Sequence, residues 1–263
     1  MLTFKQYVRA QSLDEACDLC QKRSNLVLGG MLWLKMEDRA VNTVIDLSDL
    51  GLGTIEPVEG GWRIGAMATL RDLELHPGLA ALTGGAMAES VRHIVGVQFR
   101  NLATVGGSLY GRFGFSDVLT LFLALGAVVH LHKGGDVPLE EYVTRPYERD
   151  ILTHVFLPDQ PGRTAYLAQR NISTDFPVLT CAVALRPEGV RCAIGARPMK
   201  ASLLTDEAGL LSGGVTPESA AAFAEFAAGR MTFGSNLRAS AEYRREICKV
   251  LVRRALLACK EDV

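Results

Sequence analysis

The sequence predicts an α+β protein, and three observations support this class. The first 70 residues follow a β-α-β pattern, the middle of the chain is rich in helix-like segments around two glycine pairs, and strands followed by helices begin near residue 160. Alternating or short continuous apolar runs predict strands, whereas apolar residues three and four positions apart predict helices.

The first helix is predicted in "SLDEACDLCQK". Ser12 stands at the N-cap position and Glu15 follows three residues later, which is the spacing of a capping box. "NLVLGG" then predicts a short buried strand that ends on Gly29-Gly30, and "VNTVIDLSDL" and "GWRIGAMATL" predict further strands.

The middle of the chain is predicted to be helical from Leu73 to Val95, with interruptions at Pro77 and Gly84-Gly85. A second glycine pair, Gly106-Gly107, is predicted to lie in a loop before a helix. "DVLTLFLALGAVVHLHKGG" predicts that helix, then a strand and a glycine turn, and "YERDILTHVFLP" predicts a strand.

After about residue 160 the pattern of predicted elements changes to strands followed by helices. "RTAYLAQR" and "FPVLTCAVALRPEGVRCAIGARP" predict strands joined by a hairpin at Pro187-Glu188-Gly189. Two helices follow, one opened by Pro217 and closed by Gly229, the other in "SAEYRREICKVLVRRALLACK". We therefore expect two domains, at 1–160 and 161–263.

The composition is that of an ordinary soluble globular protein. The 263 residues carry a net charge of −1 and 22% charged side chains, which provides no basic surface for nucleic acid or anionic membranes. The amino terminus lacks the apolar run of a signal peptide, and no segment approaches the roughly 20 apolar residues of a membrane span. The sequence therefore predicts a cytoplasmic protein.

The six cysteines and the paired histidines do not predict a metal site. Cys17 and Cys20 form a CxxC inside a predicted helix with no second CxxC at zinc spacing, so buried thiols are expected. His130 and His132 are two apart in a predicted strand and could face the same way and share a metal, but solvated or hydrogen-bonded histidines are favoured because no carboxylate or third ligand is close in sequence. No nucleophile–base arrangement stands out, so no catalytic residue is predicted.

The two glycine pairs are the candidate binding elements. Glycine leaves backbone N–H groups uncovered by a Cβ atom, so such groups can converge on a phosphate. The chain has neither GxGxxG after a strand nor GxxxxGK[ST], which argues against the common dinucleotide and P-loop sites. Taken alone, each pair is better explained as a turn than as a binding site.

Together, "LVLGGMLWLKM" and "QFRNLATVGGSL" resemble the flavin-binding subunits of the molybdenum hydroxylases, the family of xanthine dehydrogenase and carbon monoxide dehydrogenase. "DVLTLFLALGAVVHL" and "AQRNISTDFPVLTCAVAL" extend the resemblance over nearly the whole chain. It implies a PCMH-type FAD-binding domain of two α/β subdomains, about 1–55 and 56–160, and an α+β carboxyl-terminal domain with a three-stranded antiparallel sheet.

The resemblance also implies which residues contact FAD, by their position in the family's motifs. Arg100 or Arg112 could offset phosphate charge. Asp117 is placed beyond the second loop and could alternatively cap the following helix. The implied contacts are Val27, Leu28, Gly29, Gly30, Met31 and Leu32 in the first loop, Thr104, Val105, Gly106, Gly107 and Ser108 in the second, and Ile94, Asp117, Leu152 and Tyr166 elsewhere.

The implied function is electron transfer by an oxidoreductase subunit. FAD would take electrons from an iron–sulfur subunit, pass them to NAD or another acceptor, and serve a complex whose molybdopterin subunit oxidises the substrate. Met31, Trp33 and "GRFGFSD" depart from the family's usual motifs, and they motivate an alternative, a flavin-poor structural subunit. A stand-alone flavin oxidoreductase is a third hypothesis, for which no substrate-site residues were found.

Overall fold

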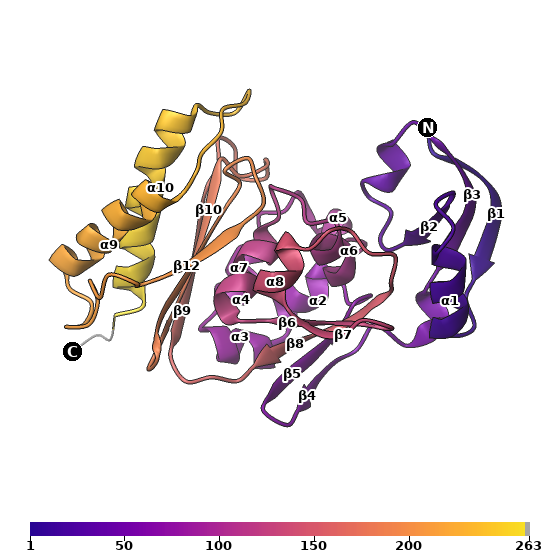
Figure 1. Ribbon diagram of the computed structural model, residues 1–263, viewed down its shortest axis with the longest axis horizontal. Coiled ribbons are helices and arrows are strands. Elements are labelled where there is room, and N and C mark those ends of the chain that lie inside the picture. Colours follow the sequence, from indigo (N-terminus) through magenta and orange to yellow (C-terminus); the bar gives the residue numbers. More distant parts are fainter. Residues whose placement is uncertain (261–263) are drawn as a thin grey trace. The chain divides into compact units, whose positions relative to one another are not determined.

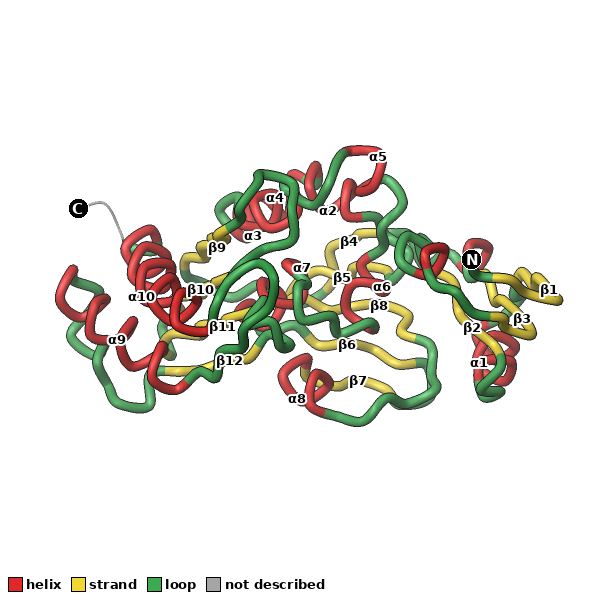
Figure 2. Tube along the Cα trace, turned by 90° about the horizontal axis from the view of Figure 1, so that it is seen from above, coloured by secondary structure: helices red, strands yellow, loops and turns green. Residues whose placement is uncertain are grey.

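The computed structural model describes residues 1–260, which divide into two compact units (Figures 1 and 2). Unit 1 comprises Met1–Asp72, Val97–Gly111 and Ala127–Pro158. Unit 2 comprises Leu73–Gly96, Arg112–Gly126 and the chain from Asp159 onward. The last segment of unit 2 therefore begins close to the boundary predicted near residue 160, but two helical segments from the middle of the chain also belong to this unit.

The amino-terminal part of unit 1 is a parallel three-stranded sheet in the order β1-β3-β2. Its elements are β1 (Thr3–Arg9), α1 (Leu13–Cys20), β2 (Asn25–Leu28) and β3 (Ala40–Asp46), followed by the short 3₁₀ turn η2 (Ser48–Leu50). Ser12 Oγ accepts a hydrogen bond from Glu15 N at 3.1 Å, which confirms the predicted cap of α1. The β-α-β pattern is confirmed, and Ala16, Cys17, Cys20 and Ile45 fill the core between α1 and the sheet.

The second sheet of unit 1 has five strands in the order β4-β5-β8-β6-β7, and all of its strand pairs are antiparallel. The strands are β4 (Ile55–Val58), β5 (Gly61–Gly65), β6 (Val128–Leu131), β7 (Gly135–Pro138) and β8 (Leu152–Pro158). The 3₁₀ turn η1 (Leu34–Met36), α5 (Val97–Arg100), α6 (Val105–Tyr110) and α8 (Leu139–Thr144) complete the unit, and α6 packs against β5 and β8.

Unit 2 is built on an antiparallel sheet of four strands in the order β12-β11-β10-β9, not the three strands expected. The strands are β9 (Arg163–Gln169), β10 (Leu179–Arg186), β11 (Gly189–Gly195) and β12 (Ser202–Thr205). The strand that the sequence did not predict is β12. Its four residues, "SLLT", form an edge strand without a clear alternation of polar and apolar residues.

Helices cover both faces of this sheet, so β10 is buried along almost its whole length. On one face lie α9 (Pro217–Arg230) and α10 (Ala241–Ala258), side by side in Figures 1 and 2. On the other lie α3 (Pro77–Thr83), α4 (Ala86–Val91) and α7 (Asp117–Leu125), while α2 (Leu70–Leu75) joins the two units along the chain. Every residue of α7 is buried.

The six cysteines are free thiols and all are buried, as predicted. Cys181, Cys192, Cys248 and Cys259 lie in the core that joins β10 and β11 to α9 and α10. Burial raises the pKa of Cys248 to about 12, so this thiol stays protonated at neutral pH. No helix within residues 1–260 is long and apolar enough to cross a membrane.

Candidate functional site

The first glycine loop leaves β2 and presents a run of unused backbone donors. The N–H groups of Gly29, Gly30, Met31 and Leu32 donate no hydrogen bond to any residue in 1–260. Met31 has φ 60°, in the left-handed region. A residue in the left-handed region is one part of the backbone arrangement that presents successive N–H groups to anions in phosphate loops. The loop can therefore receive an anionic group.

The second glycine pair lies in the first turn of α6 rather than in the predicted loop. Thr104 is the N-cap, and its Oγ1 accepts a hydrogen bond from Gly107 N at 3.1 Å. The neighbouring N–H groups are also used: Val105 N donates to Ala68 O, Gly106 N to Ala66 O and Ser108 N to Thr104 O. The loop prediction failed because glycine's low helix propensity was overridden by the cap and by contacts distant in sequence.

The structure brings the two glycine pairs together within unit 1. A Cβ atom built on Gly30 would lie 1.7 Å from Leu102 O, and one on Gly29 would lie 2.8 Å from Thr104 Oγ1. Likewise, a Cβ atom on Gly106 would lie 2.8 Å from Ala66 Cβ. Gly30 and Gly106 are thus required for close packing of the backbone.

Gly107 differs from these residues because it has space beside it. Among the described residues, and apart from its chain neighbours and the backbone of its own helix, a Cβ atom there would have only Thr104 Oγ1, at 3.0 Å, within 4 Å. Leu152, on β8 in the same unit, is 5% exposed, and α6 packs against that strand. Arg100 is also buried in unit 1.

Asp117, Tyr166 and Arg170 form a buried polar group in unit 2. Asp117 Oδ1 accepts hydrogen bonds from Tyr166 OH and Arg170 Nη2, and Arg170 Nη1 donates to Asp175 O. Burial raises the pKa of Asp117 to about 6 against the opposing effect of Arg170, and it raises the pKa of Tyr166 well above its usual value. Two predicted cofactor residues therefore contact one another. Sequence analysis missed Arg170, which directly follows β9 and lies 53 residues along the chain from Asp117.

Two other predictions about unit 2 have clear structural outcomes. Asp117 is not the N-cap of α7; Ser116 is, with its Oγ accepting from Leu119 N at 3.1 Å. Arg112 is buried and has φ 46°. Ile94 is half-buried just after α4 and belongs, with Asp117 and Tyr166, to unit 2. The predicted FAD contacts thus come from both units, and they remain predictions.

The paired histidines have separate partners, the alternative that the sequence favoured. His130 Nδ1 lies 2.7 Å from Asp136 Oδ1, and His132 Nε2 lies 2.8 Å from Asp14 Oδ1. The strand β6 ends at Leu131, next to a register irregularity, so the two rings do not share one regular strand face. Over residues 1–260, no three His, Cys, Asp or Glu side chains are grouped to hold a metal ion.

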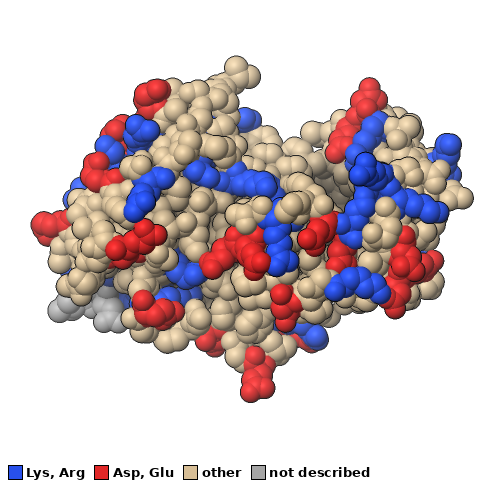
Figure 3. Space-filling model, in the orientation of Figure 1, with Lys and Arg blue, Asp and Glu red and all other residues tan. Residues whose placement is uncertain are grey.

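Basic and acidic side chains are interspersed on the face drawn in Figure 3, and neither sign covers it continuously. This mixed pattern matches the net charge of −1. It lacks the continuous basic stripe of a nucleic-acid-binding surface on that face.

Comparison with known families accounts for nearly the whole chain. Residues 2–160 match the FAD binding domain in molybdopterin dehydrogenase. Residues 164–259 match the CO dehydrogenase flavoprotein C-terminal domain. The two matches cover both glycine pairs and the four-stranded sheet.

Individual relatives are similar over their full length. The nicotine 6-hydroxylase medium subunit of Paenarthrobacter nicotinovorans is 29% identical over 272 residues, covering 96% of each chain. The glyceraldehyde dehydrogenase medium chain of Sulfolobus acidocaldarius is 24% identical, covering 95% of this chain and 96% of that one. A chain of the carbon monoxide dehydrogenase structure from Hydrogenophaga pseudoflava superposes with a TM-score of 0.86 and 25% identity, covering 97% of this chain and 96% of that one.

Proposed function

Because this chain belongs to the family of FAD-binding subunits of molybdopterin dehydrogenases, we propose that it is the electron-transfer subunit of a multi-subunit molybdenum hydroxylase, with the FAD diphosphate held at the first glycine loop. The observation that carries the placement is the run of N–H groups from Gly29 to Leu32 that have no acceptor in the described part of the chain. A diphosphate is an anionic acceptor that such a run can bind through several charge-assisted hydrogen bonds.

The chain's other residues support this placement in different ways. Thr104 caps α6 by accepting a hydrogen bond from Gly107 N. The second glycine pair would therefore provide space for the cofactor rather than N–H donors to it. The open side of Gly107 leaves room for the cofactor next to the first loop. Leu152 is a buried apolar residue of unit 1, on the strand β8 against which α6 packs.

The partners and the acceptor belong to the same proposal. The relatives are described as a medium subunit and a medium chain, which supports a role beside other subunits. We expect an iron–sulfur subunit and a molybdopterin-binding subunit as partners. FAD, when bound, supplies the redox chemistry that links one-electron iron–sulfur centres to an acceptor such as NAD.

The test is the visible absorption spectrum of the purified chain with added FAD, for the wild type and two variants of Met31. Met31→Gly suits φ 60° and should retain FAD, because glycine adopts the left-handed region easily. Met31→Pro fixes φ near −65° and removes one N–H donor, so it should weaken FAD binding by about tenfold or more.

Circular dichroism provides the control for folding, since both variants should retain the wild-type spectrum. A folded wild type that stays colourless with excess FAD would refute FAD binding by the isolated chain and favour the flavin-poor structural subunit. Undiminished FAD binding by Met31→Pro would instead contradict the role of the first loop while leaving FAD binding itself intact.

A further inference from the structure

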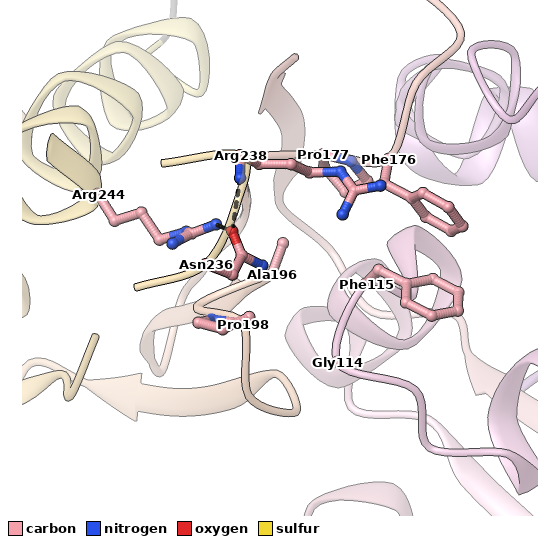
Figure 4. Close-up of a pocket in the computed structure, with 9 residues that line it drawn as sticks. All are labelled: Gly114, Phe115, Phe176, Pro177, Ala196, Pro198, Asn236, Arg238 and Arg244. Carbon is pink, nitrogen blue, oxygen red and sulfur yellow. Dashed lines mark hydrogen bonds between the residues drawn. The ribbon is translucent and has the colours of Figure 1, made fainter. Parts of the chain in front are cut away.

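Unit 2 contains a second candidate site, a pocket with a volume of about 200 Å³. Figure 4 shows the residues around it, which come from the loop before α7, the loop before β10, the turn after β11, the segment before α10 and α10 itself. None of these residues is among the predicted FAD contacts. The apolar part of its lining consists of Phe115, Phe176, Pro177, Ala196 and Pro198.

Two aromatic rings and a guanidinium group lie along one wall of the pocket. The Phe115 and Phe176 rings meet edge to face, with centroids 4.5 Å apart. The guanidinium carbon of Arg238 lies 4.7 Å from the Phe176 ring centroid, which is within the range of a cation–π interaction. This contact holds the Arg238 side chain against the aromatic wall.

The Arg238 guanidinium has unused hydrogen-bonding capacity. Its Nε is buried and has no hydrogen-bond partner among residues 1–260. Its Nη2 forms an ion pair with Asp175 Oδ1 at 3.8 Å, a separation too long for a hydrogen bond. A buried donor without an acceptor is unfavourable, so an acceptor in the pocket would relieve this cost.

Arg244, in contrast, uses its guanidinium nitrogens in hydrogen bonds to the segments around the pocket. It is 1% exposed and donates hydrogen bonds to the carbonyl oxygens of Val178, Gly234 and Ala239 and to Asn236 Oδ1. Asn236 Oδ1 also accepts from Arg238 N at 3.0 Å (Figure 4). The side-chain nitrogen of Asn236, Nδ2, donates no hydrogen bond in the described part of the chain, so it is a second available donor at the pocket.

The lining contains two arginines and, among the described residues, no carboxylate. The Asp175 carboxylate that pairs with Arg238 lies outside the lining, so the residues that face the pocket carry positive charge. An anion is favoured by this charge, and a flat apolar body by the aromatic wall. A carboxylate matches the planar guanidinium, to which it can bind through paired hydrogen bonds.

We propose that this pocket binds a small monocyclic aromatic carboxylate. The ring would lie against Phe115 and Phe176, and the carboxylate would accept hydrogen bonds from Arg238 and the amide of Asn236. The proposal does not depend on FAD, because all of its residues belong to unit 2 and none is a predicted FAD contact.

Isothermal titration calorimetry of the full chain with benzoate tests the proposal. Benzyl alcohol is the neutral ring probe and acetate is the carboxylate probe without a ring; both should bind at least about tenfold more weakly than benzoate. Arg238→Gln should weaken benzoate binding about tenfold by removing the charged donor.

Two further variants make the result specific. Arg230→Gln removes an exposed arginine that pairs with Glu207 elsewhere in unit 2 and should leave benzoate affinity unchanged. Asn236→Asp keeps the accepting oxygen but replaces the amide donor with negative charge, and it should also weaken benzoate binding.

Three outcomes would overturn the proposal. They are no heat of binding for benzoate at millimolar concentrations, equal affinity for benzyl alcohol, and undiminished benzoate affinity in both Arg238→Gln and Asn236→Asp. Unchanged thermal unfolding midpoints confirm that each variant is folded, and Asn236→Asp provides the test if Arg238→Gln does not fold.

Discussion

At the residue scale, the positions of the two glycine pairs favour glycine for different physical reasons. Gly30 and Gly106 allow two backbone segments to approach, since a Cβ atom at either position would overlap Leu102 O or Ala66. Gly29 has a milder constraint from Thr104 Oγ1, and Gly107 has open space beyond the same atom. Of the four glycines, Gly107 therefore has the most open space beside it, whereas Gly30 and Gly106 are required by the close packing of the backbone.

Replacing Gly30 with alanine should prevent normal folding of unit 1. The added Cβ atom would lie 1.7 Å from Leu102 O, and a backbone oxygen cannot move without displacing α5 and α6. We expect a loss of several kcal/mol in the free energy of unfolding, on the order of the largest single-residue effects, measured by urea denaturation. Gly53→Ala is the matched control, because no atom lies within 4 Å of its Cβ position. Equal stability of the two variants would contradict the packing role of Gly30.

Asp117 should make stability depend on pH in the acidic range. Its pKa is raised from 3.8 to about 6 by burial, so the folded state binds a proton more tightly than the unfolded state. Stability from this group is fully present below about pH 3.8 and decreases as the pH rises to about 6, by on the order of 3 kcal/mol. Urea denaturation between these pH values measures the decrease. Asp117→Asn cannot titrate, and its stability profile should lack this component; identical profiles would refute the assignment.

At the scale of elements, local hydrogen bonding decides where several helices begin. Thr216 caps α9, and Ser219 completes a capping box by accepting a hydrogen bond from Thr216 N. The helix starts at Pro217, as predicted, but continues to Arg230 rather than ending at Gly229. Glycine ends a helix best in the left-handed conformation, which Gly229 does not adopt here.

Removing the cap of α9 should destabilise unit 2 measurably. Thr216 Oγ1 accepts from Ser219 N at 3.1 Å, and Thr216→Ala leaves that donor without this partner. We expect a decrease of about 1 kcal/mol in the free energy of unfolding, measured by urea denaturation. Thr174→Ala, at an exposed threonine in the same unit, should change stability by less than about 0.5 kcal/mol. A similar loss in both variants would show that the cap is not the cause.

At the scale of the whole molecule, the chain passes repeatedly between its two units. Segments from the middle of the chain, Leu73–Gly96 and Arg112–Gly126, belong with the carboxyl-terminal sheet. The helix α7 lies in one of them and packs against β10, β11 and β12. A cut near residue 160 therefore separates α7 from the strands that bury it.

A fragment of residues 1–160 should expose the apolar surface of α7. All nine residues of this helix are buried in the full chain, and seven are Val, Leu, Phe or Ala. We expect the fragment to bind 1-anilinonaphthalene-8-sulfonate with strongly increased fluorescence and to self-associate in size-exclusion chromatography. The full chain is the control. A monomeric fragment with no dye binding would contradict this dependence of α7 on unit 2.

The sequence by itself determined the features that depend on neighbours along the chain. The cap of α1 at Ser12, the start of α9 at Pro217 and the burial of the thiols were predicted because hydrogen bonds over three residues and apolar patterns are local. The family also followed from the sequence, because the two glycine motifs and the segments around them are specific together.

Only the tertiary structure decided which groups meet across long stretches of chain. The close approach of Gly30 to Leu102, the bonds from Arg170 and Tyr166 to Asp117, and the edge strand β12 all require packing between segments far apart in sequence. The unpartnered N–H groups of the first loop belong here as well. Whether a backbone donor finds an acceptor depends on every segment folded around it, and no local pattern of residues encodes that.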